Sequence, residues 1–203
     1  MKIICVGRNY AAHAKELNNL VPKEPVIFLK PDTALLPKSM PFFYPSFSTD
    51  VHYESELVVK INRVGKNISQ KFAHKYYSEF SVGIDFTARD LQATYKEKGL
   101  PWERAKAFDG SASVGQFINK KDLADSSNLN FSLRINGAQR QAGNTSDMLF
   151  SIDSIIQYVS QFFTLKIGDL IFTGTPEGVG PIKIGDTLEA FLESKKVLDL
   201  KIK

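Results

Sequence analysis

The 203-residue sequence predicts an α+β fold weighted towards β-strands. Two observations favour this class: apolar and polar residues alternate in several short segments, and few segments have the composition or spacing of helices. The segments after residue 165 strengthen the expectation, because they contain further short strand patterns separated by turns. The length suits one domain and no segment has the composition of a linker, so we expect a single domain over residues 1–203.

The N-terminal segments are predicted to form a strand, a helix and a second strand. Lys2 to Val6 is a short apolar run that is typical of a buried strand. Asn9 is expected to cap a helix from Tyr10 to about Asn18, where several alanines favour helix. Val26 to Lys30 is predicted as a strand, and the proline-rich stretch 31–45 as irregular chain that borders a site.

Two alternating segments in the first half are predicted as half-buried strands. In residues 52–61 the apolar side chains occupy the odd positions, and in residues 80–86 they occupy the even positions. Thr87 is expected to cap the helix that follows, with Asp90 three residues later and Gly99 at its end.

The second half is predicted to contain one hairpin, one long helix and three further strands. Residues 130–135 alternate as a strand, and Asn136-Gly137 is a strong hairpin signal. A helix is expected from about Ser146 to Phe163, because its apolar residues share one face. The remaining predicted strands are residues 170–173, 187–193 and 197–201.

Composition and charge argue against several classes of protein. The 26 lysines and arginines are scattered, so the formal charge of +4 indicates a solvated surface rather than a nucleic-acid-binding face. No stretch approaches the roughly 20 apolar residues of a membrane span. Cys5 is the only cysteine, which excludes an internal disulfide and a cysteine metal cluster. We therefore expect a cytoplasmic protein that binds neither nucleic acid nor membranes.

Carboxylates in two predicted strands give the first indication of chemistry. Glu54 and Glu56 are two residues apart, so they would lie on one strand face and repel each other unless a cation sits between them. Asp85 lies on the polar face of the other strand. Three hard oxygen ligands suit Mg²⁺, Mn²⁺ or Ca²⁺. From spacing alone, an exposed polar strand face explains these residues equally well.

Two other segments combine polar residues in a suggestive way. His13 and Glu16 are three apart on a predicted helix, where a carboxylate can orient an imidazole. In isolation, a simple surface pair is the preferred interpretation. The glycine-rich segment 174–180 follows a predicted strand and either offers N–H groups to an anion or forms a tight turn. It lacks the Lys-Ser/Thr of a phosphate-binding loop, so nucleotide binding is not expected.

Taken together, five segments resemble the fumarylacetoacetate hydrolase family. They occur in the family's order and are Gly7–Glu16 (GRNYAAHAKE), His52–Leu57 (HYESEL), Gly83–Asp90 (GIDFTARD), Lys106–Asp109 (KAFD) and Thr173–Gly180 (TGTPEGVG). The resemblance implies a β-rich fold, a mixed β-sheet roll or barrel with peripheral helices, and usually a homodimer. Larger fumarylacetoacetases have an aspartate ligand where this chain has Gly7, and they carry an additional N-terminal domain. The chain therefore resembles the short acylpyruvase branch, and fumarylacetoacetate itself is disfavoured as substrate.

The resemblance also implies roles by position. The metal ligands would be Glu54, Glu56 and Asp85, holding Mg²⁺, with Mn²⁺ or Ca²⁺ as alternatives, and no other cofactor is implied. His13 with Glu16 would form the general-base dyad. The resemblance further implies that Lys106 is a catalytic lysine. It also implies three substrate-binding residues, which are Arg89, Gln92 and Thr175.

The implied activity is metal-dependent cleavage of the C–C bond of acylpyruvates such as acetylpyruvate or fumarylpyruvate. Water activated by His13 would attack the C4 carbonyl, and a metal-stabilised pyruvate enolate would leave. Oxaloacetate decarboxylation and the isomerisation or hydration of unsaturated 2-oxo acids, of the 2-hydroxyhepta-2,4-diene-1,7-dioate type, share this enolate and remain alternatives. A non-catalytic metabolite-binding protein is the alternative from another class. Leu100-Pro101-Trp102 either closes over the metal as a lid or simply ends a helix.

Overall fold

The largest element of the fold is a seven-stranded mixed sheet, seen in a computed structural model that describes residues 1–16, 20–125 and 127–203. Its order is β2-β1-β11-β4-β5-β7, with β8 also paired to β5. Strands β1 and β11 run parallel, whereas β4 and β5 run antiparallel. The bounds are β1 Ile3–Gly7, β2 Val26–Lys30, β4 Ser55–Ile61, β5 Tyr77–Asp85, β7 Ala112–Val114, β8 Ile118–Asn119 and β11 Leu170–Phe172.

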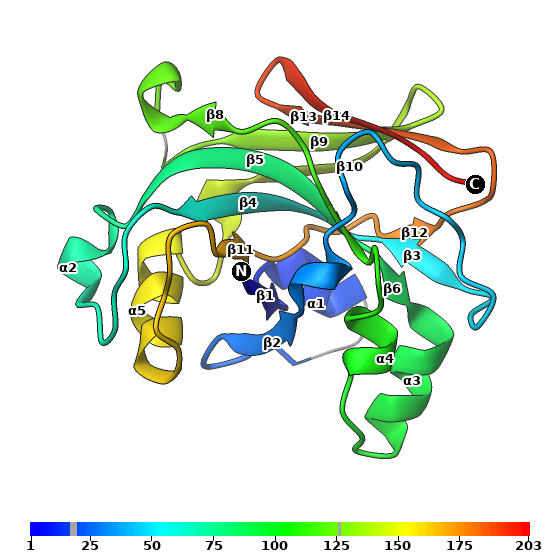
Figure 1. The fold of residues 1–203 in the computed structure, drawn as a ribbon, viewed down its shortest axis with the longest axis horizontal. Coiled ribbons are helices and arrows are strands. Elements are labelled where there is room, and N and C mark those ends of the chain that lie inside the picture. The colour runs from blue at the N-terminus through cyan, green and yellow to red at the C-terminus, as the bar shows by residue number, and fades with distance from the viewer. Residues whose placement is uncertain (17–19, 126) are drawn as a thin grey trace.

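Two smaller sheets complete the β structure. A four-stranded sheet has the order β10-β9-β13-β14, and a three-stranded sheet has the order β12-β3-β6. The four-stranded sheet lies across the curved strands β4 and β5, so that the sheets curl into a half-barrel (Figure 1). The bounds are β9 Asn130–Ile135, β10 Ala138–Asn144, β13 Thr187–Leu192, β14 Lys195–Lys201, β3 Val51–Tyr53, β6 Thr87–Ala88 and β12 Gly180–Pro181. The predicted β-rich α+β class with a mixed, curled sheet is confirmed.

The helices are short and lie at the periphery (Figure 1). Single 3₁₀ turns occur at Asp32–Ala34, Lys120–Asp122 and Thr145–Asp147. Among the described residues, no helix is long and apolar enough to cross a membrane. The bounds of the α-helices are α1 Ala11–Glu16, α2 Gln70–Ala73, α3 Arg89–Glu97, α4 Glu103–Lys106 and α5 Ile152–Phe162.

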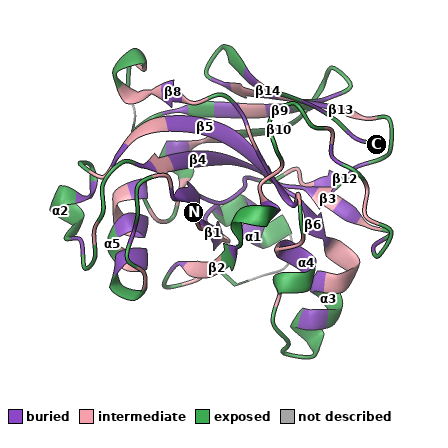
Figure 2. Cartoon of the chain, in the orientation of Figure 1, coloured by how far each residue is buried: buried purple, intermediate pink, exposed green. Residues whose placement is uncertain are grey.

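Strand β4 lies in the middle of the large sheet and is buried on both faces (Figure 2). On one face, Leu57 and Val59 belong to the main core, which also contains residues of β9, β13 and α5. On the other face, Val58 packs in a second core with Cys5 and Phe172. The expectation of a half-buried strand is therefore wrong, because other elements cover both faces. The even-numbered face of this segment, with Glu56, is the buried wall of a site rather than a solvated surface.

The predicted hairpin is confirmed, and the geometry of its turn explains the residue types found there. Strands β9 and β10 pair antiparallel across Asn136-Gly137. Both residues have positive φ, 52° for Asn136 and 81° for Gly137, the left-handed conformation that a two-residue hairpin loop of this kind requires. Asparagine and glycine tolerate this conformation best, so the local sequence determined the turn correctly.

The predicted helix boundaries differ from the structure at the two longest described helices, α5 and α3. Helix α5 begins at Ile152 rather than near Ser146, because the hydroxyl of Ser151 caps it by accepting the N–H of Ser154. Thr87 does not cap α3: it lies in β6, and its hydroxyl accepts a hydrogen bond from a lysine. At Thr87 the local cap signal was overruled by a contact with a distant part of the chain.

The first helix begins after Tyr10, at Ala11, and the end predicted at Asn18 lies outside the described residues. Asn9 is fully buried, and its side-chain amide donates to the carbonyl oxygens of Phe150 and Thr173. Its side-chain oxygen accepts the N–H of Phe150. Asn9 therefore fixes the turn before α1 against two distant segments, a role that local sequence does not reveal.

Candidate metal centre and active site

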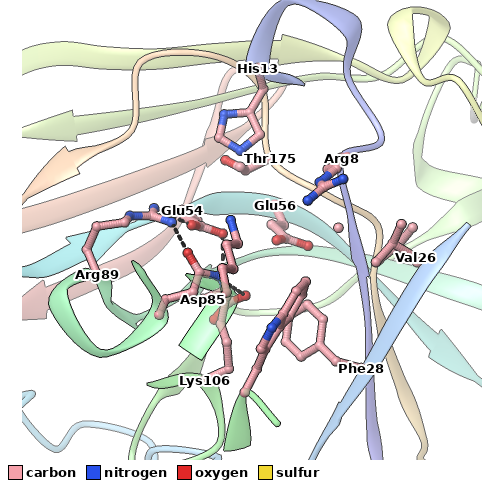
Figure 3. A pocket seen from close by; sticks show the side chains of 15 residues that line it. Arg8, His13, Val26, Phe28, Glu54, Glu56, Asp85, Arg89, Lys106 and Thr175 are labelled. Carbon is pink, nitrogen blue, oxygen red and sulfur yellow. Dashed lines mark hydrogen bonds and ion pairs between the residues drawn. The ribbon is translucent and has the colours of Figure 1, made fainter. Parts of the chain in front are cut away.

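Three carboxylates meet where strands β3, β4 and β5 come together. Glu54 lies between β3 and β4, Glu56 lies on β4, and Asp85 is the last residue of β5. The N–H of Asp85 donates to the carbonyl oxygen of Glu54 over 2.8 Å, which fixes the two segments against each other. One oxygen of each carboxylate lies within 4.8 Å of the others, and all three residues are buried. Figure 3 shows the three side chains converging in one pocket.

Two cations neutralise part of this acidic cluster. Lys106, the last residue of α4, donates to Glu54, Asp85 and the hydroxyl of Thr87, at 2.8, 2.8 and 2.6 Å. Arg89 donates to the other oxygen of Glu54. Burial alone would raise the pKa of Glu54, but Lys106 and Arg89 lower it well below its usual range. Burial likewise opposes the charge of Lys106, yet Asp85 and Glu54 raise the pKa of this lysine above its usual value.

Glu56 differs from the other two carboxylates because it lacks a cationic partner among residues 1–16, 20–125 and 127–203. One of its oxygens accepts the N–H of Gly174 over 2.7 Å. Burial, together with Asp85 and Glu54, raises the pKa of Glu56 well above its usual range. A buried, ionised Glu56 therefore needs an additional positive charge. Three hard carboxylate oxygens, one of them short of a cation, fit a divalent metal ion of the Mg²⁺ or Mn²⁺ type.

Sequence reasoning missed Lys30, the last residue of β2. Its side chain is fully buried, and its ammonium lies 2.7 Å from Asp85. The same ammonium donates to the backbone carbonyl oxygens of Lys106 and Ser111. Lys30 thereby ties the end of α4 to the acidic cluster. The only signal in the sequence was that Lys30 ends an apolar strand, and a lysine at such a position is ordinarily exposed to solvent.

The predicted dyad is brought together on helix α1. Nδ1 of His13 and a carboxylate oxygen of Glu16 are 3.0 Å apart. The second oxygen of Glu16 accepts the N–H of Gly178 over 3.0 Å, which links the helix to the glycine-rich loop. His13 is buried and lines the same pocket as the three carboxylates (Figure 3). With Nδ1 engaged by Glu16, Nε2 is the nitrogen left to exchange a proton with a ligand.

The glycine-rich loop presents Thr175 to the pocket, and a second residue missed from sequence holds it there. The side-chain amide of Gln141, on β10, donates to the hydroxyl of Thr175 over 2.8 Å and to the carbonyl oxygen of Pro176 over 3.0 Å. Its side-chain oxygen accepts the N–H of Ser55. Gln141 is buried in a strand that has no large apolar residue and two glutamines, so nothing in the pattern distinguished it.

Two of the predicted substrate-binding residues lie side by side on α3. Arg89 donates to Gln92 over 2.7 Å as well as to Glu54, so its guanidinium supports the acidic cluster. The buried amide of Gln92 lines the pocket and has its N–H groups left for a ligand. Trp102, of the segment considered as a lid, lines the pocket and packs edge-to-face on Phe28, with ring centroids 6.1 Å apart. This segment forms part of the pocket wall between α3 and α4.

Comparisons with known proteins agree with this geometry. Over 201 residues the chain is 46% identical to the mitochondrial oxaloacetate tautomerase FAHD1 of Mus musculus, covering 99% of this chain and 91% of that protein. It is also 46% identical to the oxaloacetate tautomerase YcgM of Escherichia coli over 188 residues, covering 92% and 86%. A crystal structure of fumarylpyruvate hydrolase from Pseudomonas aeruginosa, in complex with Mn²⁺ and pyruvate, superposes with a TM-score of 0.93 at 36% identity, covering 100% and 89%.

A family match covers almost the whole chain. Residues 2–203 match the family described as fumarylacetoacetate (FAA) hydrolase C-terminal. This match includes all five segments from which the resemblance was inferred, and the relatives named above are enzymes. The chain therefore belongs to the fumarylacetoacetate hydrolase family.

Proposed function

We propose that the protein is a divalent-metal-dependent enzyme that interconverts the enol and keto forms of oxaloacetate. The observation that carries the proposal is one buried pocket with a three-carboxylate metal centre and the His13–Glu16 pair. The names of the mouse and E. coli relatives support oxaloacetate as the substrate. This preference revises the expectation of acylpyruvate hydrolysis, which becomes the second candidate.

The chemistry requires proton transfer at C3 of a 2-oxo acid. A bound divalent cation would supply a Lewis acid that favours negative charge on the C2 oxygen. His13 would take a proton from C3 of the keto form through Nε2, and the C2 oxygen of the resulting enolate would gain a proton from water to give the enol. In the reverse direction the enol would lose its O–H proton to water, and His13 would return a proton to C3. Glu16 fixes the ring by engaging Nδ1 at 3.0 Å. General acid–base catalysis of this kind contributes about 10²–10⁴-fold in rate.

Lys106 takes a supporting role in this proposal. All three of its N–H groups are engaged, by Glu54, Asp85 and Thr87. It therefore orients and neutralises the metal ligands, and a donor to the substrate must come from elsewhere. The candidates are the hydroxyl of Thr175 and the side-chain N–H groups of Gln92, which donate no hydrogen bond within the described residues, because both side chains line the pocket. Each would donate to a substrate oxygen.

The test is a tautomerase assay on freshly dissolved enol-oxaloacetate. Malate dehydrogenase and NADH consume the keto form as it appears, so that tautomerisation limits the signal. The proposal expects acceleration by the protein with Mg²⁺ or Mn²⁺, loss of acceleration with EDTA, and a fall of about 10²–10⁴-fold for His13→Ala. Equal rates with and without the protein, at metal saturation, would refute it.

Hydrolysis of acylpyruvates is the second candidate because His13 with Glu16 also suits the activation of water. The structural likeness to a fumarylpyruvate hydrolase supports it. Pyruvate release from acetylpyruvate, measured on the same preparations, separates the two activities. Pyruvate release from oxaloacetate, measured alongside, reports decarboxylation. A rate on acetylpyruvate that exceeds the tautomerase rate would make hydrolysis the principal activity.

A further inference from the structure

The pocket contains cationic side chains beyond those that pair with its carboxylates. The ammonium and guanidinium groups of Lys30, Lys106 and Arg89 all form ion pairs with Glu54 or Asp85. Two other cations line the pocket and form no ion pair within the described parts of the chain. These two are Arg8 and Lys96.

Arg8 is held towards the pocket by an unusual backbone conformation. It follows β1 and has φ of 60°, a left-handed conformation that is uncommon for residues other than glycine. The next residue, Asn9, locks the turn through its bonds to Phe150 and Thr173, and its carbonyl oxygen accepts the N–H of Leu149. Such backbone strain persists where the surrounding structure enforces it, and it gathers at functional sites. Figure 3 shows the guanidinium of Arg8 among the side chains of the pocket.

Lys96 reaches the same pocket from helix α3. It follows Gln92 by four residues and Arg89 by seven, so the three share one face of the helix. Its ammonium lies 5.7 Å from the ring centroid of Trp102, over the pocket wall. Partial desolvation there, together with the charges of Arg89 and Arg8, lowers the pKa of Lys96. Glu54 raises the pKa of Lys96 but offsets only part of this lowering, so the surroundings of Lys96 have a net positive potential.

We propose that Arg8 and Lys96 form a subsite for the distal carboxylate of the substrate, so that the enzyme selects 2-oxo dicarboxylic acids over 2-oxo monocarboxylic acids. The proposal rests on the proposed function, in which C1 and C2 of the substrate occupy the metal centre. A guanidinium matches a carboxylate with two parallel donors, and an ammonium adds a point charge. Arg8 and Lys96, which line the pocket, thus favour a substrate with an acidic substituent on C3.

The kinetic test compares oxaloacetate with its 4-methyl ester, which has nearly the same shape without the distal charge. For Arg8→Gln, we expect kcat/KM for oxaloacetate to fall about 10- to 100-fold, because a charge-assisted bond is lost. The ester should change by no more than about twofold. Lys96→Gln should act in the same direction with a smaller effect. Lys98→Gln, at an exposed position two residues further along, is the matched control and should change neither substrate.

A binding measurement tests the subsite without turnover. Calorimetry on the Mn²⁺-loaded protein compares malate with lactate, which share the C1 carboxylate and C2 oxygen but differ in the distal carboxylate. Wild type should bind malate about tenfold more tightly, and Arg8→Gln should bring the two affinities together by weakening malate alone. Equal affinities for malate and lactate in the wild type, or an equal loss of affinity for both in Arg8→Gln, would refute the proposed subsite. A malate preference in a protein that does not tautomerise oxaloacetate would support the subsite and reject the proposed function.

Discussion

Glu56 and Asp85 should respond in opposite ways when their charges are removed from the metal-free protein. Asp85 is paired with Lys30 and Lys106, so Asp85→Asn leaves buried ammonium groups uncompensated. Breaking a buried ion pair from one side costs about 3–5 kcal/mol of unfolding free energy. Glu56 has no such partner in the described chain, and its charge is disfavoured by burial, Asp85 and Glu54. Glu56→Gln keeps an acceptor for the N–H of Gly174, so we expect stability unchanged or raised by about 1–2 kcal/mol.

The assay is urea unfolding of wild type and both variants at neutral pH, first with EDTA and then with saturating Mg²⁺ or Mn²⁺. Metal at about 100 times its dissociation constant should stabilise the wild type by about 2.7 kcal/mol. Both variants should lose most of this gain, because each replaces a charged carboxylate ligand with a neutral amide. Two results would show that Glu56 is not a metal ligand lacking a cationic partner in the metal-free protein. One is that Glu56→Gln destabilises the EDTA-treated protein as much as Asp85→Asn does, and the other is that it keeps the full stabilisation by metal.

Three further predictions concern the dyad, the turn before α1 and the start of α3. His13→Ala should lower tautomerase turnover about 10²–10⁴-fold but retain the stabilisation by metal, since His13 lies outside the carboxylate cluster; loss of that stabilisation in the urea assay would contradict this. Asn9→Ala should cost about 2–4 kcal/mol in urea unfolding, because it orphans buried groups of Phe150 and Thr173; a loss below about 1 kcal/mol would argue against its bracing role. Asp90→Asn should lower stability by about 0.5–1 kcal/mol at neutral pH. Burial raises the pKa of Asp90, but hydrogen bonds from Ser48, Thr49 and Leu91 lower it below the ordinary value of 3.8 overall. The stability that the Asp90 carboxylate contributes is therefore fully present above pH 3.8 and is lost as the pH falls through the lower pKa of the folded state. Urea midpoints at a series of pH values should therefore converge at acid pH, and a gap that stays constant would contradict the assignment.

The parts of the fold that follow local rules could be predicted from sequence. The hairpin at Asn136-Gly137 was located because its two positive φ angles demand those residue types. Helix α3 was found, but its cap was not, because Thr87 binds Lys106, which is 19 residues away in the chain. The burial of both faces of β4 depends on which strands flank it and what covers the sheet, and period-two alternation does not contain that information.

The residues of the candidate site also fall into those that the sequence marked and those that only the structure reveals. The convergence of the three carboxylates could be anticipated because their spacing allowed a metal site and the family motifs marked the same residues, whereas His13 was marked by the family motif alone. Lys30 and Gln141 were missed, because each acts through contacts made across more than thirty positions of sequence. Arg8 lay inside a recognised motif, but only the structure distinguishes its guanidinium, which forms no ion pair within the described residues, from the paired one of Arg89.

The most direct test of the central claim is a crystal structure of the protein grown with Mn²⁺ and oxalate, an unreactive mimic of C1 and C2 of a 2-oxo acid. We expect one anomalous peak, bonded to Glu54, Glu56 and Asp85, with two oxalate oxygens, one from each carboxylate group, bound to it on the side of His13 and Gln92. A manganese ion bound elsewhere, or oxalate held away from the metal, would contradict the proposed centre.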